Sequence, residues 1–594
     1  MHTMQTVVNM EQFGLIDSSD EAAVPQAGGR VGSSAAVDST LAVARALEYC
    51  RDLEYPVLVF PKGRYHFWPD RAFEQQLFIS NHDQEKLRRA AFPLIWFDSI
   101  TIDGQGSEFI FHGYITPFIV DHSRHVVLRN FSIDWEQPFL FQGTVLDVGE
   151  QSVDVKLDEP YAYEIVNRKL IFEGEGWKQP AKGLIEMDPV TQAPAYGSGD
   201  SLNYGHFAKL EVEEAVAGTV RFVGPMKRKP NPGGVIIIQC GKRDAPGIFV
   251  KDSEDVQVQA VNVYHAVGMG LIAQKSADIR LNRFNVMRRP GSGRLFSTLA
   301  DATHFVYCRG TVEMEDCLFE NQMDDPSNVH GIYAQVAEKL ADHTVLVKLV
   351  HFQQVGVEVA SPGDVMEFVD NESLAAYDRL TVKAVKRLNS QYTSITFDRP
   401  LPATMKEKDV LENVSWSADF TVRRCTVRGN RARGFLITTR GRVLLEHNTI
   451  STPGTGIKIS GDANYWFESG AVRDMTIRHN TFVDCNYCYP QWGKAVIDID
   501  PEIKDPARFD VCYHRNIRIE HNTFRTFNPA IVRGHSVDGL IFRGNTIERT
   551  ETYPATEDEL HAVHLTACEN VVMEGNVFVH GPATALIGSE RVEL

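Results

Sequence analysis

The chain has 594 residues, 43% of them hydrophobic and 23% charged, which is the composition of a globular protein with a buried core. Its formal net charge is −18 without any basic block, which argues against nucleic acid or an anionic membrane as the main partner and favours a neutral substrate or cations held by carboxylates. No apolar run approaches the roughly 18 residues that a membrane span requires.

The N-terminal sequence, MHTMQTVVNMEQFGLIDSSDEA, lacks a basic start followed by an apolar stretch, so no signal peptide is expected in the chain as given. The compartment stays open between the cytoplasm and a secreted or periplasmic location with a trimmed leader. Nine cysteines favour a reducing compartment. Cys485 and Cys488 form a single CxxC, for which buried thiols are the better interpretation than zinc; we expect neither a metal nor another cofactor.

The first element expected in chain order is a helix over 38–53. Its sequence, DSTLAVARALEYCRDL, begins with Asp38 and Ser39 as capping residues and continues with amphipathic spacing. A solenoid needs its open ends covered, so we expect this helix to cover the first coil of a repeat. The stretch YPVLVFPKGRYHF at 55–67 then begins the coils.

One phrase repeats along the chain: a strand, a small polar corner, and then asparagine, threonine and a hydrophobic residue. It reads LLEHNTI, TIRHNTF, RIEHNTF, IFRGNTI and VMEGNVF in the C-terminal half. With earlier and weaker copies included, the key position is occupied by Asn130, Asn262, Asn285, Cys317, Cys425, Asn448, Asn480, Asn522, Asn545 and Asn576.

The intervals between these positions indicate the fold. Positions 262 and 285, 425 and 448, and 522 and 545 are each 23 residues apart, and two steps of 32 add a nine-residue loop. A period in the twenties with short β-rich runs predicts an all-β solenoid, a right-handed parallel β-helix whose coils stack about 4.8 Å apart. We expect asparagines in register to form an amide ladder, with Cys317 and Cys425 in the same slot.

Two intervals are too long for one coil, 132 residues from 130 to 262 and 108 residues from 317 to 425. Both inserts contain alternating strand patterns and predict small antiparallel β-barrels. The predicted domains are the cap and first coils at 1–138, an inserted barrel at 139–245, coils at 246–332, a second inserted barrel at 333–416, and C-terminal coils at 417–594.

The corner in ENQMDDPSNVHG, at 320–331, differs from the others. Eight residues past the key position, other coils have a small residue, Gly270, Gly293, Gly456 or Ala530, because the chain turns there. This coil instead has Asp324 and Asp325. Aspartates before proline are common in turns, so the pair alone has a purely structural explanation.

A third acid changes that interpretation. Asp301 precedes Asp324 by 23 residues, one full coil, so we expect it to lie roughly under Asp324. Like charges in one place are unfavourable unless they share a proton, a cation or a substrate. Crowding raises at least one pKa and leaves a protonated acid beside an ionised base, which glycosidic bond cleavage requires.

These motifs resemble those of glycoside hydrolase family 110, the exo-acting α-1,3-galactosidases of the blood group B-cleaving type. The resemblance covers most of the chain and rests on the capped β-helix, the two inserts and the phrases ADATHF, NQMDDPSNVHG and ISGDANYWFESG. Polygalacturonases of family 28 share the acid arrangement but lack such inserts. They usually carry Gly-His-Gly and Arg-Ile-Lys motifs, which are absent here.

The resemblance implies the catalytic roles. It makes Asp324 the general acid, and Asp325 with Asp301 the base that holds the nucleophilic water. It also implies inversion at the anomeric carbon, for which acid and base stand about 6.5–9.5 Å apart. If the backbone there is extended, Asp324 and Asp325 point to opposite sides of the sugar.

Further residues are candidates for binding galactose. Trp466 is expected to stack on the sugar, and loop residues nearby offer polar groups for its hydroxyls. The polar candidates are Asp462, Asn464, Glu468, His304, His330 and Arg440. Each also has a structural explanation, such as an inward core position for His304 or a solvated arginine at 440.

The predicted function is therefore removal of terminal α-1,3-linked galactose from an oligosaccharide or glycoconjugate, by a protein that could form a homodimer. Three alternatives stay open at this point: a polygalacturonase-like hydrolase, a lyase that uses calcium, and a glycan-binding β-helix without activity. Release of galacturonate, loss of activity in chelator, or binding without turnover would distinguish them.

Overall fold

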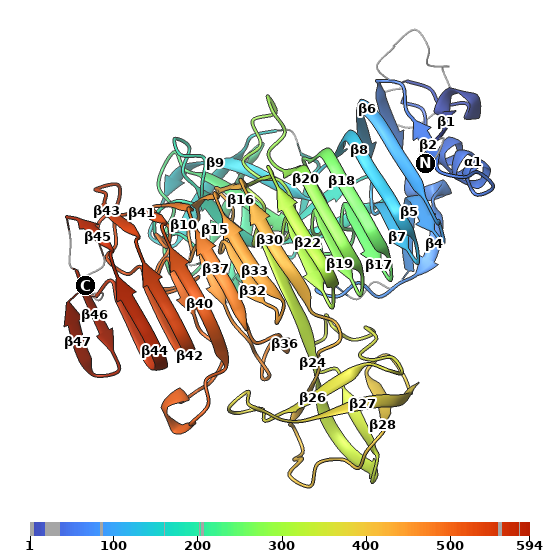
Figure 1. The fold of residues 1–594 in the computed structure, drawn as a ribbon. Helices are drawn as coiled ribbons and strands as arrows, with labels where there is room; N and C mark the ends of the chain where they lie inside the picture. The colour runs from blue at the N-terminus through green and yellow to red at the C-terminus, as the bar shows by residue number, and fades with distance from the viewer. Residues whose placement is uncertain are drawn as a thin grey trace.

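The computed structural model describes residues 5–17, 36–83, 87–159, 161–200, 202, 207–555, 561–580 and 583–593. The chain winds into a parallel β-helix from which a barrel of antiparallel strands projects, as the ribbon in Figure 1 shows. The N-terminal sequence on which the signal-peptide prediction was based, 1–22, lies partly outside the described residues, at 1–4 and 18–22. None of the described helices is long and apolar enough to cross a membrane.

The N-terminal helix α1 (Thr40–Cys50) packs on β2 (Pro56–Val59) and β5 (Leu87–Ile95) through a buried face. Asp38 caps it by accepting hydrogen bonds from the backbone nitrogen and the hydroxyl of Thr40, at 3.0 and 2.6 Å. The expected capping role of Ser39 is wrong, because its side chain makes no capping bond. The remaining N-terminal strands are β1 (Thr6–Asn9), β3 (Arg64–Phe67) and β4 (Phe73–Gln76).

Three rows of parallel strands make the coils. The row that carries the candidate site contains β5, β7 (Thr116–Asp121), β17 (Ile248–Lys251), β19 (Leu271–Gln274), β21 (Thr303–Val306), β24 (Ser327–Ala341), β32 (Phe435–Thr438), β35 (Ile457–Ile459), β39 (Ile497–Ile499) and β42 (Val532–Arg543).

The second row runs beside it. Its strands are β6 (Ile100–Phe111), β8 (Arg124–Trp135), β18 (Glu254–Val263), β20 (Ala277–Val286), β22 (Arg309–Glu315), β30 (Ala418–Arg423), β33 (Arg442–Glu446), β37 (Asp474–Arg478), β40 (His514–Glu520) and β44 (Val563–Glu574), with the long β42 continuing from the first row. Their inward residues stack in register in one buried column: Val258, Leu281, Met314, Val422, Leu445, Ile477, Ile519 and Phe542.

The third row is shorter: β23 (Leu318–Glu320), β31 (Thr426–Arg428), β34 (Thr449–Ser451), β38 (Thr481–Val483), β41 (Thr523–Thr526), β43 (Thr546–Arg549) and β45 (Val577–Val579). The hairpin β46 (Thr584–Ile587) and β47 (Glu590–Glu593) follows it. Parallel strands exchange backbone hydrogen bonds only with their neighbours above and below, so each coil is held by the next.

Both inserts are antiparallel. The first forms an eight-stranded sheet of β9 (Leu140–Val148), β10 (Ser152–Leu157), β11 (Tyr163–Val166), β12 (Lys169–Gly174), β13 (Trp177–Met187), β14 (Glu211–Val216), β15 (Thr219–Val223) and β16 (Val235–Cys240). The second extends from β24 through β25 (Thr344–Lys348), β26 (Val365–Val369), β27 (Ala376–Arg387), β28 (Tyr392–Phe397) and β29 (Val410–Asn413). The predicted fold class, a capped β-helix with two inserted barrels, is confirmed.

The asparagine ladder exists over the C-terminal coils. The side-chain amide of Asn480 donates to Oδ1 of Asn522 at 3.0 Å, and Asn522 donates to Asn545 at the same distance. Each Oδ1 also accepts the backbone N–H of the preceding asparagine. Asn448 and Asn576 continue the ladder at its two ends.

The predicted register fails in two earlier coils. Asn262 stands opposite Ser132 rather than Asn130, which adopts a left-handed conformation and donates to Asp103 instead. Val286 pairs with Phe319, which places Asn285 opposite Leu318 and not opposite Cys317. In the first case the pairing of β8 with β18 is regular, and Ser132 holds the position that the repeat assigned to Asn130. In the second case one additional residue between Arg309 and Val312 shifts the pairing of β22 with β20, which a fixed period does not represent.

We predict that Asn522→Ala lowers the free energy of unfolding by about 3 kcal/mol, because buried groups on both neighbouring coils lose the hydrogen bonds that they make to this side chain. Asn576→Ala at the half-exposed end of the ladder is the matched control, since water can replace its bonds. Urea denaturation measures both. Equal effects of the two substitutions contradict the ladder as a stabilising element.

Candidate active site

Two of the three predicted acids occupy equivalent positions in neighbouring coils. Thr303 of β21 pairs with Ser327 of β24. Asp301 lies two residues before Thr303, and Asp325 lies two residues before Ser327. The Ala302 N–H donates to the carbonyl of Asp325 at 2.9 Å, which continues the ladder into the corner. The coil offset is therefore 24 residues, from 301 to 325. The expected stacking of Asp301 under Asp324 is wrong by one residue.

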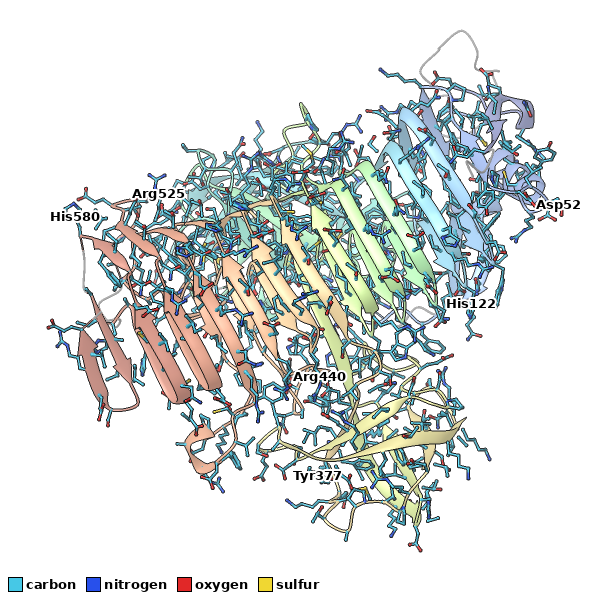
Figure 2. The ribbon with its side chains drawn as sticks, viewed as in Figure 1. Asp52, His122, Tyr377, Arg440, Arg525 and His580 are labelled. Atoms are coloured by element: carbon cyan, nitrogen blue, oxygen red, sulfur yellow. The ribbon has the colours of Figure 1, made fainter. Side chains whose placement is uncertain are left out.

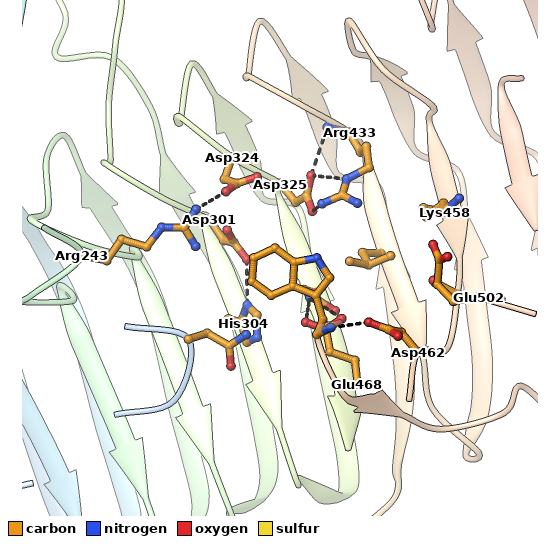
Figure 3. A pocket seen from close by; sticks show the side chains of 15 residues that line it. Arg243, Asp301, His304, Asp324, Asp325, Arg433, Lys458, Asp462, Glu468 and Glu502 are labelled. Carbon is orange, nitrogen blue, oxygen red and sulfur yellow. Dashed lines mark hydrogen bonds and ion pairs between the residues drawn. The ribbon is translucent and has the colours of Figure 1, made fainter. Parts of the chain in front are cut away.

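All three aspartates nevertheless line one cavity (Figure 3). The sequence-predicted residues His304, Asp462, Trp466 and Glu468 also line it. Residues that the sequence analysis did not single out complete the wall: Asn81, Arg243, Asn328, Arg433, Leu436, Lys458, Ser460 and Glu502. Of the other predicted residues, Asn464, His330 and Arg440 are not part of this lining.

The floor of the cavity is one register row of the β-helix. His304, Asn328, Leu436 and Lys458 pair in sequence along β21, β24, β32 and β35, and all four line the cavity. Side chains alternate between the two faces of a strand, so these residues face outward while their neighbours fill the core. His304 therefore faces the cavity and not the core.

Three arginines hold the acids. Arg243 pairs with Asp324, Arg433 pairs with Asp325 at 3.0 Å, and Arg431 stands 3.5 Å from Asp324. Figure 3 shows Arg243 and Arg433 on either side of the three carboxyl groups. Arg243 follows the last strand of the first insert, so this insert contributes directly to the site.

The charges give the three acids different pKa values. Burial, followed by the neighbouring Asp324, raises the pKa of Asp301 to about 8. Burial also raises the pKa of Asp325 to about 7, although Arg433 opposes the rise. Burial would raise the pKa of Asp324 as well, but the three arginines outweigh it and lower that pKa. Near neutral pH the group holds a proton, which Asp301 keeps most strongly.

Behind Asp301, two histidines continue a chain of hydrogen bonds. Oδ2 of Asp301 is 2.7 Å from Nδ1 of His304, whose Nε2 is 2.8 Å from Nε2 of His330. Nδ1 of His330 donates to the carbonyl of Gly331 at 2.7 Å. With neutral histidines, this donation leaves Nε2 of His330 as an acceptor, so His304 donates to it and Asp301 must carry the proton.

A second arrangement places the same proton on His330 and leaves Asp301 ionised. The resulting imidazolium would face Glu468, whose Oε1 is 3.5 Å from Nε2 of His330. Burial lowers the pKa of His304 well below its usual value, so His304 transfers the proton and does not keep it. His330 thus affects the cavity through Asp301, although it does not line the cavity itself.

The loop at 460–470 covers one side of the cavity. Asp462 shapes it by accepting the backbone N–H groups of Asn464, Tyr465 and Trp466. The short strand β36 (Glu468–Ser469) then pairs with β24 and brings Glu468 to Asn328, with both carboxylate oxygens 3.4 Å from the amide nitrogen. Asn464 is exposed and donates to a carbonyl of the second insert, at Asn371.

Arg440, predicted to bind galactose, lies outside the cavity. Its guanidinium pairs with Glu367 and, at 2.6 Å, with Glu412, two buried carboxylates of the second insert. In Figure 2 it lies where this insert joins the β-helix. The sequence gives no sign of these partners, because both are far from Arg440 along the chain.

One further group of donors lies outside the cavity. Within the described part of the chain, Asp121, His122 and Asp252 are close enough to hold a metal ion. The ammonium of Lys251 pairs with Asp252 and stands 3.6 Å from Asp121, so a cation of the protein already balances this group.

Comparison with known proteins identifies the family. Models named GLAA-B beta-barrel domain I and domain II match residues 141–236 and 344–411, and a right-handed beta helix region matches 410–500. Alpha-1,3-galactosidase A of Shewanella woodyi is 36% identical over 576 residues, covering 96% of this chain and 91% of that protein. The chain belongs to the α-1,3-galactosidase family, glycoside hydrolase family 110.

Other members of the α-1,3-galactosidase family are similarly close. Alpha-1,3-galactosidase B of Bacteroides thetaiotaomicron is 34% identical and covers 96% of this chain and 90% of its own. Among solved structures, the A-module of mannuronan C-5 epimerase AlgE4 of Azotobacter vinelandii covers 94% of this chain and 99% of its own, at 10% identity. Its TM-score of 0.38 is too low to bear on function.

We predict that Arg440→Met destabilises this α-1,3-galactosidase family member by about 3 kcal/mol, because it takes the paired cation from the buried carboxylate of Glu412, whereas Glu367 keeps Arg379. The KM for an α-galactoside should stay unchanged, since Arg440 does not reach the cavity. Thermal unfolding and steady-state kinetics measure the two effects. A raised KM in a stably folded variant contradicts the structural role.

Proposed function

We propose that the protein is an exo-glycosidase that hydrolyses terminal α-1,3-linked galactose from glycans, of the blood group B or linear α-galactosyl type, with inversion at the anomeric carbon. Membership in the α-1,3-galactosidase family supports the substrate class. The observation that carries the proposal is the convergence of Asp301, Asp324 and Asp325 on one cavity. Inverting hydrolysis needs one carboxylic acid and one carboxylate on opposite sides of the glycosidic bond.

The rest of the cavity suits a neutral sugar. Trp466 offers an apolar face, while Asp462 and Glu468 offer acceptors for hydroxyl groups. Asn328 also lines the cavity and adds an amide to these polar groups. These residues therefore provide stacking and hydrogen bonds that an uncharged sugar can use.

The alternative of a polygalacturonase-like hydrolase is less favoured. An acidic sugar needs a cation that is not already neutralised, but the cations of this cavity are paired. Arg243 and Arg433 hold aspartates, and Lys458 stands 3.1 and 2.7 Å from the carboxylates of Asp498 and Asp500. Galacturonate would have to compete with these partners.

The roles that the family resemblance implies require a proton to move when substrate binds, because the pKa directions of the three acids are the reverse of those roles. Before substrate binds, the proton belongs to Asp301, and the arginines keep Asp324 ionised. Transfer of this proton to Asp324 on substrate binding creates the acid at 324 and the base at 301 and 325 in one step. Asp324 then protonates the glycosidic oxygen as the C1–O bond breaks.

Completion of the reaction restores the starting arrangement. Water forms the new bond to C1 from the opposite side and gives its proton to Asp301 or Asp325, while Asp324 returns to the ionised form. Hydrolysis thus returns the three acids to the protonation from which it began. The histidine chain behind Asp301 provides a second place for that proton, at His330.

The direct test of this function is incubation with Galα1-3Gal and NMR detection of the first galactose anomer. We predict initial β-galactose; initial α-galactose contradicts inversion and the acid–base roles. Substitution of Asp301, Asp324 or Asp325 by Asn should each reduce turnover of Galα1-3Gal by at least about 100-fold without unfolding the protein. Asp98→Asn, at an exposed ion pair, is the control.

The leaving group distinguishes the acid from the base. We expect Asp324→Asn to retain activity on 2,4-dinitrophenyl α-galactoside, because its leaving group needs no protonation, whereas Asp325→Asn stays inactive on it. If Asp325→Asn is active on this substrate and Asp324→Asn is not, Asp325 is the acid and Asp324 is the base. Wild-type turnover of Galα1-3Gal by any single variant removes that aspartate from the mechanism.

We predict that Arg433→Gln moves the acidic limb of the kcat/KM profile to higher pH. Arg433 favours the ionised form of Asp325, so its removal raises the pKa of that carboxyl further above about 7. The base is active only when ionised, and ionisation then requires a higher pH, by about one unit. A pH profile on p-nitrophenyl α-galactoside measures this; an unmoved or downward-shifted limb contradicts Asp325 as a base.

The homodimer suggested from the sequence remains a prediction, which sedimentation velocity tests directly.

A further inference from the structure

We propose that an aromatic platform beside the cavity, formed by His351, Phe352, Tyr465 and Trp466, binds the sugar to which the terminal galactose is linked. This inference rests on the proposed function, since it requires a glycan that enters the cavity with its non-reducing end. It assigns a role in substrate binding to the second insert, which contributes two of the four rings.

The platform is continuous with the cavity. Trp466 lines the cavity, and its ring centroid is 4.7 Å from that of His351 and 5.3 Å from that of Tyr465. The ring of Phe352 follows at 4.9 Å from His351. The four rings therefore extend outward without a break from the wall of the catalytic cavity.

The outer rings are unusually exposed for their size. Tyr465 is 69% exposed and Phe352 is 58% exposed, although both have large apolar surfaces that would be more stable out of water. Their positions are not those of frayed loop ends. They flank the half-buried ring of His351 and the exposed ring of Trp466, so the exposed surface is a single patch and not scattered side chains.

Hydrogen bonds between the two domains hold the platform in place. The side-chain amide of Gln354, which is buried in the second insert, donates to the carbonyl of Trp466 at 2.7 Å. Asn464 donates across to the carbonyl of Asn371 at 3.2 Å. The 460–470 loop is thus fixed to the insert, and its rings are presented without an ordering cost on binding.

The chemistry of the patch favours a neutral sugar ring as its occupant. Phenylalanine, tyrosine and tryptophan rings pack well on the C–H faces of a pyranose, and burial lowers the pKa of His351, which keeps that ring uncharged at neutral pH. The anomeric carbon of a galactose in the cavity must face the three aspartates. A sugar linked to that carbon extends out of the cavity, and the platform is the aromatic surface that adjoins the cavity wall at Trp466.

A second copy of this chain is the competing occupant of an exposed aromatic patch. The proposal commits to the glycan, because the patch is continuous with the cavity and shares Trp466 with it. A dimer contact at the platform would instead cover the mouth of the cavity. The two possibilities give different results in the experiment below.

The experiment compares two substrates, α-galactosyl fluoride, which has no second sugar, and a trisaccharide that ends in α-1,3-linked galactose. We expect Phe352→Ala and Tyr465→Ala each to raise the KM for the trisaccharide by about tenfold. The kcat/KM for the fluoride should stay within about twofold of the unsubstituted protein. Phe352→Tyr and Tyr465→Phe, which keep a ring, should restore trisaccharide binding.

Leu340→Ala is the matched control. Leu340 is 47% exposed near the far end of β24 in the same insert and is expected to leave both substrates unaffected. Unchanged trisaccharide kinetics in the Phe352 and Tyr465 variants overturn the proposal, as do equal losses on both substrates or a change from dimer to monomer in sedimentation. If the unsubstituted protein hydrolyses neither substrate, the proposed function itself is wrong.

Discussion

The parallel backbone ladder between consecutive coils is the constraint on which the candidate site depends. It fixes which residues of neighbouring coils stand side by side, and a shift of one residue would turn every side chain to the opposite face of its strand. The pairing of Thr303 with Ser327 brings Asp301 beside Asp325, and continued pairing adds Arg433 from the following coil. Asp301, the adjacent pair Asp324 and Asp325, and Arg433 thus meet although they belong to three successive coils.

The ladder also explains why the acids can coexist in a buried place. Like charges close together are unfavourable, and the site relieves this in two ways. Arginines hold Asp324 and Asp325, and a histidine chain shares the proton of Asp301 with a residue one coil further along. The result is a mixture of protonated and ionised carboxyl groups near neutral pH, which acid–base hydrolysis requires.

Much of the fold could be predicted from the sequence, because the spacing of the repeated phrase gives the length of one coil. The 23-residue spacing, the asparagine ladder and the two inserts follow from it. The period fails where a strand is irregular: one additional residue between Arg309 and Val312, beside Gly310 in a left-handed conformation, shifts the pairing of β22 and sets the coil offset at 24. The partners of Arg243 and Arg440 were not predictable, because they depend on how each insert packs on the β-helix. His304 could be identified because it shares a strand with the acid corner.

The central claim is that coil register places the reacting carboxyl groups around one sugar. A crystal structure of the Asp324→Asn variant soaked with Galα1-3Gal tests it most directly. The account predicts the terminal galactose in the cavity, with its anomeric carbon facing side chains 301, 324 and 325 and a water between the carbon and Asp325. A galactose bound elsewhere, or carboxyl groups of Asp301 and Asp325 directed away from the sugar, would contradict it.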